Sequence, residues 1–278
     1  MVSVQGIGDA VSAAIAECAV TLRPDVLAAL RQALASEESP RGREVLSQLI
    51  DNAEIARSDG LPLCQDTGSV WVWVELGADE CLGGNVQAAV DEAVRRTYRE
   101  RALRMSIVRD ALLDRQNTGD NTPAFVDVTL RPGCGATVHV MLKGGGSDNA
   151  SALAMLDPAA GADGIRRFVL ETVSAKGAGA CPPLIVGVGV GGTFDSAAKL
   201  AKRALLVPLD APADEGLAEF ETRLLADIDA LGIGPAGLGG TTTALGVRVV
   251  TGPCHIAALP VAVNLGCSAM RSASVEIG

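Results

Sequence analysis

Seven cysteines are the side chains in this 278-residue sequence with the widest choice of chemistry. They are Cys18, Cys64, Cys81, Cys134, Cys181, Cys254 and Cys267. An odd number at wide, irregular spacing does not make a disulfide framework, and no pair has the CxxC spacing of a zinc ribbon. Each cysteine is therefore either a small buried hydrophobe or a ligand for a metal or a substrate.

Four segments depart from the pattern of a plain hydrophobic core, and two of them precede residue 150. Residues 62–68, PLCQDTG, place Cys64, Gln65 and Asp66 in one loop between a predicted helix and a predicted strand. Ligand-type side chains are concentrated there, although such residues also simply bond the backbone of a turn. Residues 143–149, KGGGSDN, put three glycines after a predicted strand. Their N–H groups are able to face an anion, and a tight bend without a ligand is the alternative.

The third segment, residues 179–183, places Cys181 directly before two prolines and an apolar run. Prolines stiffen the chain and lack N–H donors, so the cysteine sulfur would be held in one place, as a metal ligand must be. A plain entry into a strand is the alternative interpretation.

The fourth segment, residues 252–271, contains Cys254, His255 and Cys267. His255 lies in a predicted loop next to cysteine, which favours a functional role, whereas His139 lies inside a strand pattern and is expected to be structural. Three of the four segments thus offer a thiolate. Three thiolates would hold an iron–sulfur cluster with one iron left open as a Lewis acid, and whether they meet is a question of tertiary structure.

The elements that must position these segments are typical of a mixed α/β chain. Helical spacing predicts a helical N-terminal part over residues 1–60, and later helices over 85–101, 163–175, 196–206 and 215–231. Strands are predicted over 70–76, 124–130, 136–142, 184–190, 244–250 and 259–264, with a Pro-Gly turn joining the second to the third. The apolar run 184–190 indicates a strand buried on both faces. We expect a mixed α/β fold, a helical N-terminal part followed by a mixed sheet with packed helices, in one domain over 1–278.

Charge and composition narrow the classes of function. The formal net charge of −10 disfavours nucleic acid and anionic membrane surfaces as partners. No apolar run is long enough to span a bilayer, and the N-terminus lacks the basic start of a signal peptide. We therefore expect a cytoplasmic protein, with a core of aliphatic side chains because aromatic residues make up only 3% of the chain.

The motifs resemble one family from about residue 39 to residue 271, nearly the whole chain. PLCQDTG, NTGDNTPA, KGGGSDN, ACPPLIVGVGVGGT, LGIGPAGLGGTTTALGV and PCHIAALPVAVN, the last followed by a cysteine, are similar to class I fumarate hydratases. They are equally similar to the related L(+)-tartrate dehydratases. The chain resembles the α subunit of the two-subunit form, so the resemblance implies a β-subunit partner in a hetero-oligomer.

The resemblance also implies a cofactor and a set of site residues. The family carries an oxygen-sensitive [4Fe–4S] cluster on three cysteines, which here correspond to Cys64, Cys181 and Cys267. A pocket for a small dicarboxylate would be lined by side chains and glycine N–H groups, namely Gln65, Asp66, Arg104, Gly145 and Gly146. Asp66 and His255 would be catalytic, and Cys254 a bystander.

Hydration of fumarate to L-malate, a step of the tricarboxylic acid cycle, needs the chemistry that these residue types offer. The reverse reaction removes a proton next to a carboxylate and expels hydroxide. An open iron takes the hydroxyl as a Lewis acid, while a positioned base and cations deal with the proton and the developing charge. L(+)-tartrate is the alternative substrate. A non-catalytic iron–sulfur subunit is the alternative of another class, and it predicts a fourth cysteine ligand, with Cys254 the candidate.

Overall fold

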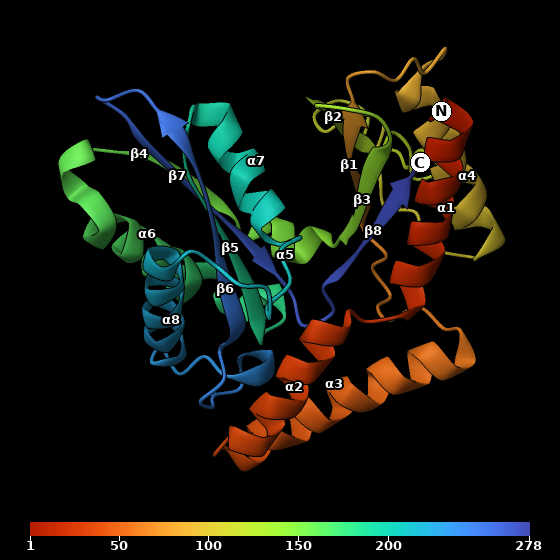
Figure 1. The fold of residues 1–278 in the computed structure, drawn as a ribbon. Coiled ribbons are helices and arrows are strands. Elements are labelled where there is room, and N and C mark those ends of the chain that lie inside the picture. Colours follow the sequence, from red (N-terminus) through yellow and green to blue (C-terminus); the bar gives the residue numbers. More distant parts are fainter. The chain divides into compact units, whose positions relative to one another are not determined.

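The computed structural model describes residues 1–278, which form two compact units (Figure 1). Unit 1 comprises Met1–Arg23, Ala53–Gly145 and Arg271–Gly278, and unit 2 comprises Pro24–Asn52 and Gly146–Met270. Neither unit is a continuous piece of chain. The predicted single domain therefore stays a prediction, and one cooperative unfolding transition seen by several probes would support it.

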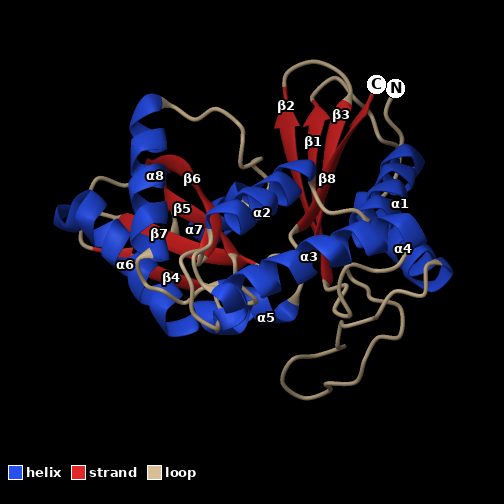
Figure 2. Ribbon diagram, turned by 90° about the horizontal axis from the view of Figure 1, so that it is seen from below, coloured by secondary structure: helices blue, strands red, loops and turns tan.

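Unit 1 is built on a four-stranded mixed sheet in the order β2-β1-β3-β8 (Figure 2). The strands are β1 (Ser69–Gly77), β2 (Phe125–Arg131), β3 (Ala136–Lys143) and β8 (Arg271–Ile277). Helices α1 (Val4–Val20) and α4 (Val86–Glu100) cover one face. Because side chains alternate along a strand, Val70, Val72 and Val74 of β1 all point to this helix-covered face and form the core.

The Pro-Gly turn after β2 joins it to β3, as the sequence predicts, but the two strands are not neighbours. β1 lies between them, parallel to β2 and antiparallel to β3. A parallel pair needs a long crossover, and the segment with α4 supplies it between β1 and β2. The turn then passes over the end of β1, where Ala78 N donates to Arg131 O at 2.8 Å.

Unit 2 contains a second four-stranded mixed sheet in the order β4-β7-β5-β6. The strands are β4 (Ala152–Leu156), β5 (Leu184–Gly192), β6 (Ala244–Cys254) and β7 (Leu259–Gly266). Helices α6 (Gly161–Lys176) and α8 (Glu215–Asp229) pack on one face, and α7 (Phe194–Ala204) packs on the other. The helical N-terminal part continues in α2 (Pro24–Ser36) and α3 (Pro40–Asp59).

Strand β5 is buried on both faces, which confirms the prediction from its apolar run. Its valines, such as Val186 and Val188, face the cluster that includes α6 and α8. The alternate positions are glycines, and a Cβ added at Gly187 would lie 2.3 Å from the carbonyl oxygen of Ala201 in α7. The Val-Gly alternation therefore lets one helix approach the strand backbone closely while the opposite face fills the core.

The mixed α/β prediction is confirmed, with two sheets in place of one. Strands β4 and β8 were not predicted from the sequence. The glycine-rich segment after β3 is not an open loop, since Gly145–Asn149 forms the short helix α5. Single 3₁₀ turns occur at Pro158–Ala160, Gly177–Ala180 and Pro235–Gly237.

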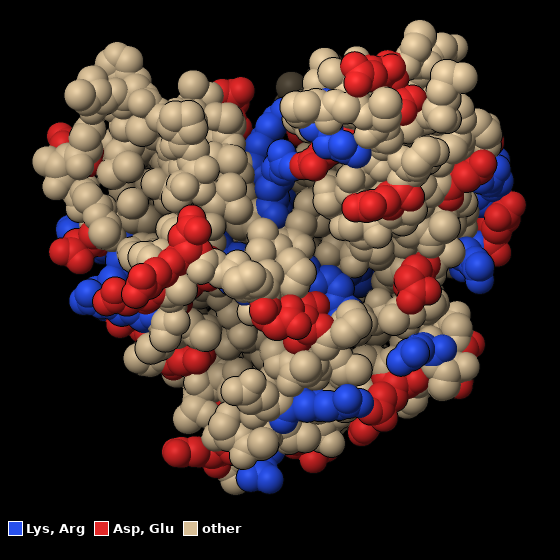
Figure 3. Space-filling view, viewed as in Figure 1, with Lys and Arg blue, Asp and Glu red and all other residues tan.

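The distribution of surface charge and the character of the helices can be compared with the expectations about nucleic acid and membranes. Acidic and basic side chains are interspersed on the face drawn in Figure 3, so the net charge of −10 is not gathered there into one acidic patch. None of the helices combines the length and the apolar character that crossing a bilayer requires.

A buried carboxylate fixes the glycine- and threonine-rich loop of unit 2. Glu37, in the turn between α2 and α3, is only 2% exposed. Its oxygens accept backbone N–H bonds from Thr241 at 2.8 and 3.1 Å, Thr242 at 2.9 Å and Ser39 at 2.9 Å. Burial acts to raise the pKa of Glu37, but these bonds outweigh it and lower the pKa to about 2.

We expect Glu37→Gln to lower the free energy of unfolding at pH 7 by about 3 kcal/mol, since each pKa unit is worth about 1.4 kcal/mol. A folded-state pKa of about 2 lies below the ordinary value of 4.5. The stabilisation is therefore present above pH 4.5 and is lost as the pH falls toward 2. Urea unfolding at pH 7 and pH 3 measures both effects. Glu38→Gln, at the exposed neighbouring position, is the control, and an equal loss in both variants would contradict the assignment.

Candidate functional site

The loop that carries Cys64, Gln65 and Asp66, called the CQD loop below, connects α3 to β1 and is tightly anchored at Gly68. Gly68 has a φ of +87°, and a Cβ there would lie 2.3 Å from the carbonyl oxygen of Lys143. Only glycine has both the conformational freedom and the small size that this contact requires. The sequence motif CQDTG thus ends in glycine because the loop lies directly against the end of β3.

Two buried side chains bind the Gly68 carbonyl oxygen from the other side. Tyr98 Oη in α4 donates to it at 3.0 Å, and Asn121 Nδ2 donates at 3.1 Å. Asn121 is fully buried and adopts a left-handed φ of 60°, and its Oδ1 accepts from the backbone N of Ser106 at 2.7 Å. The NTGDNTPA motif therefore ties the CQD loop to the segment around Ser106.

Asp66 is the point in unit 1 at which several distant segments meet. Its Oδ1 accepts from Ser106 Oγ at 3.2 Å, and its Oδ2 accepts from the backbone N of Gly145 at 3.0 Å. Its carbonyl oxygen accepts from Arg271 Nη2 at 2.8 Å. Asp66 is half-buried, so its carboxylate is oriented by these partners and still reaches solvent. This is the arrangement that a positioned acid or base requires.

Other predicted residues of unit 1 lie on or near this loop. Cys64 Sγ, which is half-buried, contacts Gln65 Oε1 at 3.3 Å, and Gln65 itself is exposed. Arg104 is exposed two residues before Ser106, which places its backbone beside the Asp66 partner. The predicted N–H donor Gly145 is engaged by Asp66, so an anion that used this donor would share it with that carboxylate.

In unit 2 the structure brings Cys181 and Cys267 to the same end of the sheet. Cys181 lies three residues before β5 and Cys267 directly after β7, and the antiparallel register pairs Ile185 with Gly266. The backbone N of Ser268 donates to the carbonyl oxygen of Cys181 at 3.1 Å. Cys181 is exposed in a left-handed conformation with φ of 57°, and Cys267 is half-buried. Both thiols therefore lie on well-defined backbone at one end of the sheet.

His255 lies at the opposite end of the same sheet. It follows β6 and precedes β7, whereas Cys267 follows β7, so the eight-residue strand separates them by roughly 24 Å. His255 is exposed, and its Nδ1 accepts from the backbone N of Ala257 at 3.1 Å. Cys254 is in the same turn, where its Sγ contacts Ala258 O at 3.3 Å. Within unit 2, therefore, neither residue belongs to the end of the sheet that carries Cys181 and Cys267.

The donor set suits an iron–sulfur cluster. Within neither unit are three or more His, Cys, Asp or Glu side chains gathered into a complete metal site. Thiols are nevertheless the ligands that iron–sulfur clusters use, and none of the seven forms a disulfide. Cys64 stands on the loop anchored at Gly68, and the Cys181 and Cys267 segments are hydrogen-bonded to one another.

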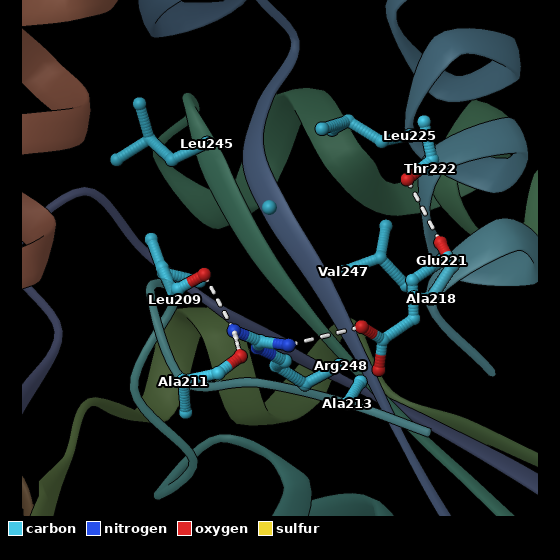
Figure 4. A pocket seen from close by; sticks show the side chains of 11 residues that line it. Leu209, Ala211, Ala213, Ala218, Glu221, Thr222, Leu225, Leu245, Val247 and Arg248 are labelled. Carbon is cyan, nitrogen blue, oxygen red and sulfur yellow. Dashed lines mark hydrogen bonds and ion pairs between the residues drawn. The ribbon is translucent and has the colours of Figure 1, made fainter. Parts of the chain in front are cut away.

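A pocket of about 240 Å³ in unit 2 contains none of the predicted site residues (Figure 4). It lies between α8, β6 and the loop that precedes α8. Its charged residues, Arg248 and Glu221, pair at 3.0 Å, and Arg248 Nη2 also donates to the carbonyl oxygens of Leu209 and Ala211. Because the guanidinium and the carboxylate neutralise one another, the pocket offers little to a charged ligand.

His139, expected to be structural, lies in β3 with its Nδ1 2.7 Å from Ser274 Oγ of β8. Four residues that hold the CQD loop and Asp66 in place were not predicted to do so from the sequence: Tyr98, Ser106, Asn121 and Arg271. The only signal for Asn121 was its place in the NTGDNTPA motif. Arg271 is the last residue of the fourth segment, but the sequence does not predict its contact with Asp66, because a hydrogen bond to a backbone carbonyl oxygen leaves no pattern in a sequence.

Comparison with known proteins finds a family model and several relatives that match most of the chain. A family model described as fumarate hydratase (Fumerase) matches residues 8–276. The chain is 38% identical to "Putative L(+)-tartrate dehydratase subunit alpha" of Methanocaldococcus jannaschii, over 98% of this chain and 97% of the relative. It is 33% identical to the L(+)-tartrate dehydratase subunit alpha of Escherichia coli K12 and of Shigella sonnei, over 91% of this chain and 84% of each relative. With the motifs and the matched length taken together, the chain belongs to the fumarate hydratase family of hydro-lyases.

Proposed function

We propose that this chain is the α subunit of an iron–sulfur hydro-lyase that, with a β subunit, adds water to fumarate to form L-malate. The observation that carries the proposal is the arrangement at Asp66. A carboxylate oriented by Ser106 and Gly145 lies two residues from a cysteine, in a member of a hydro-lyase family. A proton-transfer group and a cluster ligand on one anchored loop are what this chemistry needs.

The roles of the individual residues follow from their types. Cys64, Cys181 and Cys267 would hold a [4Fe–4S] cluster, which supplies, when bound, a Lewis-acidic iron for the substrate hydroxyl. Asp66 takes up or delivers the proton at the carbon next to a substrate carboxylate, through whichever carboxylate oxygen faces the substrate.

Substrate binding in this proposal uses charge and backbone donors. The exposed guanidinium of Arg104 grips one carboxylate, and the Gln65 amide orients the substrate. Gly145 and Gly146 lie at the start of α5 and are exposed, so their backbone is accessible to the second carboxylate.

His255 is proposed as the second catalytic residue, with a condition that the structure adds. It lies at the end of its sheet opposite to Cys181 and Cys267. For His255 to act beside a cluster, the turn between β6 and β7 has to reach a site that includes another chain. An assembly of more than one chain is therefore part of the proposal, as is the β subunit suggested by the relatives' name "subunit alpha".

L(+)-tartrate is the second candidate substrate, because the relatives reported above are named L(+)-tartrate dehydratase subunits. It needs the same cysteines and the same proton-transfer residues, and it differs in the hydroxyl groups that the pocket must accept. The non-catalytic alternative required Cys254 as a fourth ligand. Cys254 lies in the turn at the opposite end of β7 from Cys267, which disfavours that role within one chain.

The deciding experiment is anaerobic reconstitution with iron and sulfide, with and without a co-expressed β partner, followed by assays on fumarate, malate and L-tartrate. We expect the isolated chain to bind a cluster and to turn over little substrate, and the complex to be active. Activity on L-tartrate alone would identify the second candidate. A loaded complex that is inactive on all three substrates would overturn the hydro-lyase proposal.

The carboxylate clamp can be tested separately. Arg104→Lys should raise the Michaelis constant strongly, because lysine cannot reproduce the two-point grip of a guanidinium on a carboxylate. Arg101→Lys and Arg109→Lys are matched controls: both positions are exposed, and Arg109 pairs with Asp114 at 3.9 Å. Steady-state kinetics at equal cluster content make the comparison. If all three variants behave alike, the clamp comes from the partner subunit.

A further inference from the structure

Arg271 is the largest fully buried side chain in the protein, with 1% of its surface exposed. It begins β8, in register with Leu142 of β3. Its Nη2 donates to the carbonyl oxygen of Asp66 at 2.8 Å. Its Nε and Nη1 are buried and have no hydrogen-bond partner. The guanidinium of Arg271 has five N–H donors, yet it is buried in unit 1 and makes a single hydrogen bond, to the Asp66 carbonyl oxygen of the CQD loop.

Arg248 in unit 2 shows how this protein buries an arginine for structural reasons (Figure 4). It is 6% exposed, pairs with the Glu221 carboxylate at 3.0 Å and binds two backbone carbonyl oxygens. Its positive charge is balanced and most of its donors are used. Arg271 has no such carboxylate and only one acceptor, so it is not explained by the same role.

Burying a charge and leaving donors unpaired both disfavour the folded state. An apolar side chain of similar length would fill the same space without these penalties, and such replacements are often neutral or stabilising. The positive charge is also felt by its surroundings: burial raises the pKa of Cys18 to about 12, and Arg271 acts against that rise. What Arg271 provides in exchange is the bond to Asp66, on the loop that bears Cys64 and Gln65.

We propose that Arg271 is a positioning residue for the Cys64–Gln65–Asp66 loop, retained for function and not for stability. Its guanidinium fixes the Asp66 carbonyl, while Gly145 and Ser106 orient the Asp66 carboxylate from the other side. Together these bonds fix both ends of one residue. The inference rests on the proposed function of this loop, and it adds a residue that touches neither substrate nor cofactor.

The test compares Arg271→Met with Arg248→Met by three measurements. On the full chain without cluster, Arg271→Met should leave the unfolding midpoint unchanged or raise it, whereas Arg248→Met should lower it because Glu221 remains buried without its partner. Hydrogen exchange of the backbone amides of residues 64–68 should become at least about tenfold faster in Arg271→Met only, because the loop loses an anchor.

The third measurement is steady-state kinetics of the complex with its β subunit, reconstituted to equal cluster content. Arg271→Met should lower kcat by about a hundredfold, the scale of a displacement near 1 Å at a reacting group, with a smaller change in KM. Arg271→Lys, which keeps the charge and one donor toward Asp66, should recover part of the loss. Arg248→Met should leave kcat close to wild type wherever it is folded.

The outcomes separate this inference from the proposed function. Faster exchange in the CQD loop with unchanged stability supports the positioning role even if the complex proves inactive on every substrate tested. A drop in stability as large as that of Arg248→Met, without faster exchange in the loop, would overturn it. If Arg271→Met does not fold, Arg271→Gln, which retains a donor for the Asp66 carbonyl, is measured in its place, and a failure of that variant also to fold assigns Arg271 to the core.

Discussion

Serine in place of Cys64, Cys181 or Cys267 should abolish both the visible absorbance of a reconstituted cluster and the hydratase activity of the complex. Each thiolate would be one of only three protein ligands, so the loss of one leaves two. A serine hydroxyl is a much poorer ligand for iron, and it differs from cysteine too little in size to disturb these exposed or half-buried positions. Iron content, sulfide content and absorbance on the anaerobic protein measure the effect.

Cys254→Ser is the matched control for this series, because Cys254 is exposed like Cys181 and lies in the same unit, but at the other end of β7. It should keep full absorbance and activity. A result in which Cys254→Ser loses the cluster while Cys267→Ser retains it would show that the ligand assignment is wrong. Retention of the cluster by all four variants would show that none of these four cysteines is a required ligand.

Asp66→Asn and His255→Asn should each lower kcat by on the order of a hundredfold or more, the usual contribution of an acid–base residue, with the cluster spectrum retained. Asparagine keeps the shape of Asp66: its oxygen can accept the bond from the backbone N of Gly145, and its amide NH2 can donate to Ser106 Oγ in place of the other bond. Stopped-flow or steady-state assays at matched cluster content give the rates. Loss of the cluster in either variant would point to a role in supporting the ligands instead.

The position of His255 makes mixed assemblies informative. Suppose that one site takes Asp66 from one copy of this chain and His255 from another copy. An assembly that contains both Asp66→Asn and His255→Asn chains then has some sites in which neither residue is substituted. Mixing the two inactive variants under conditions of subunit exchange should then restore part of the activity. Absence of any recovery, in assemblies shown to be mixed, would place His255 outside the catalytic set.

Local structure followed closely from the sequence in the regions with strong periodicity. Helices α4, α6, α7 and α8 begin and end close to their predicted limits, because helical spacing of apolar residues marks them. Strand β5 was recognisable as doubly buried from its apolar run. Strands β4 and β8 were missed, since their short and partly polar patterns have no strong alternation.

Residue types alone indicated the candidate chemistry: thiols in loops, a carboxylate next to them and a histidine in a turn. These are properties of composition and spacing, and a structure adds nothing to them. The motif resemblance then supplied the family, which the comparisons confirm. The sequence by itself therefore determined the mixed α/β class and the family.

Only the tertiary structure decided which of these residues lie together. Strand direction determines that Cys181 and Cys267 share a sheet end and that His255 lies at the other, and direction depends on pairing between strands far apart in the chain. The bond from Arg271 to Asp66 joins residues 205 positions apart, and both partners use atoms that every arginine and every peptide bond possess. Such contacts are determined by packing and not by residue type, which is why no pattern in the sequence predicts them.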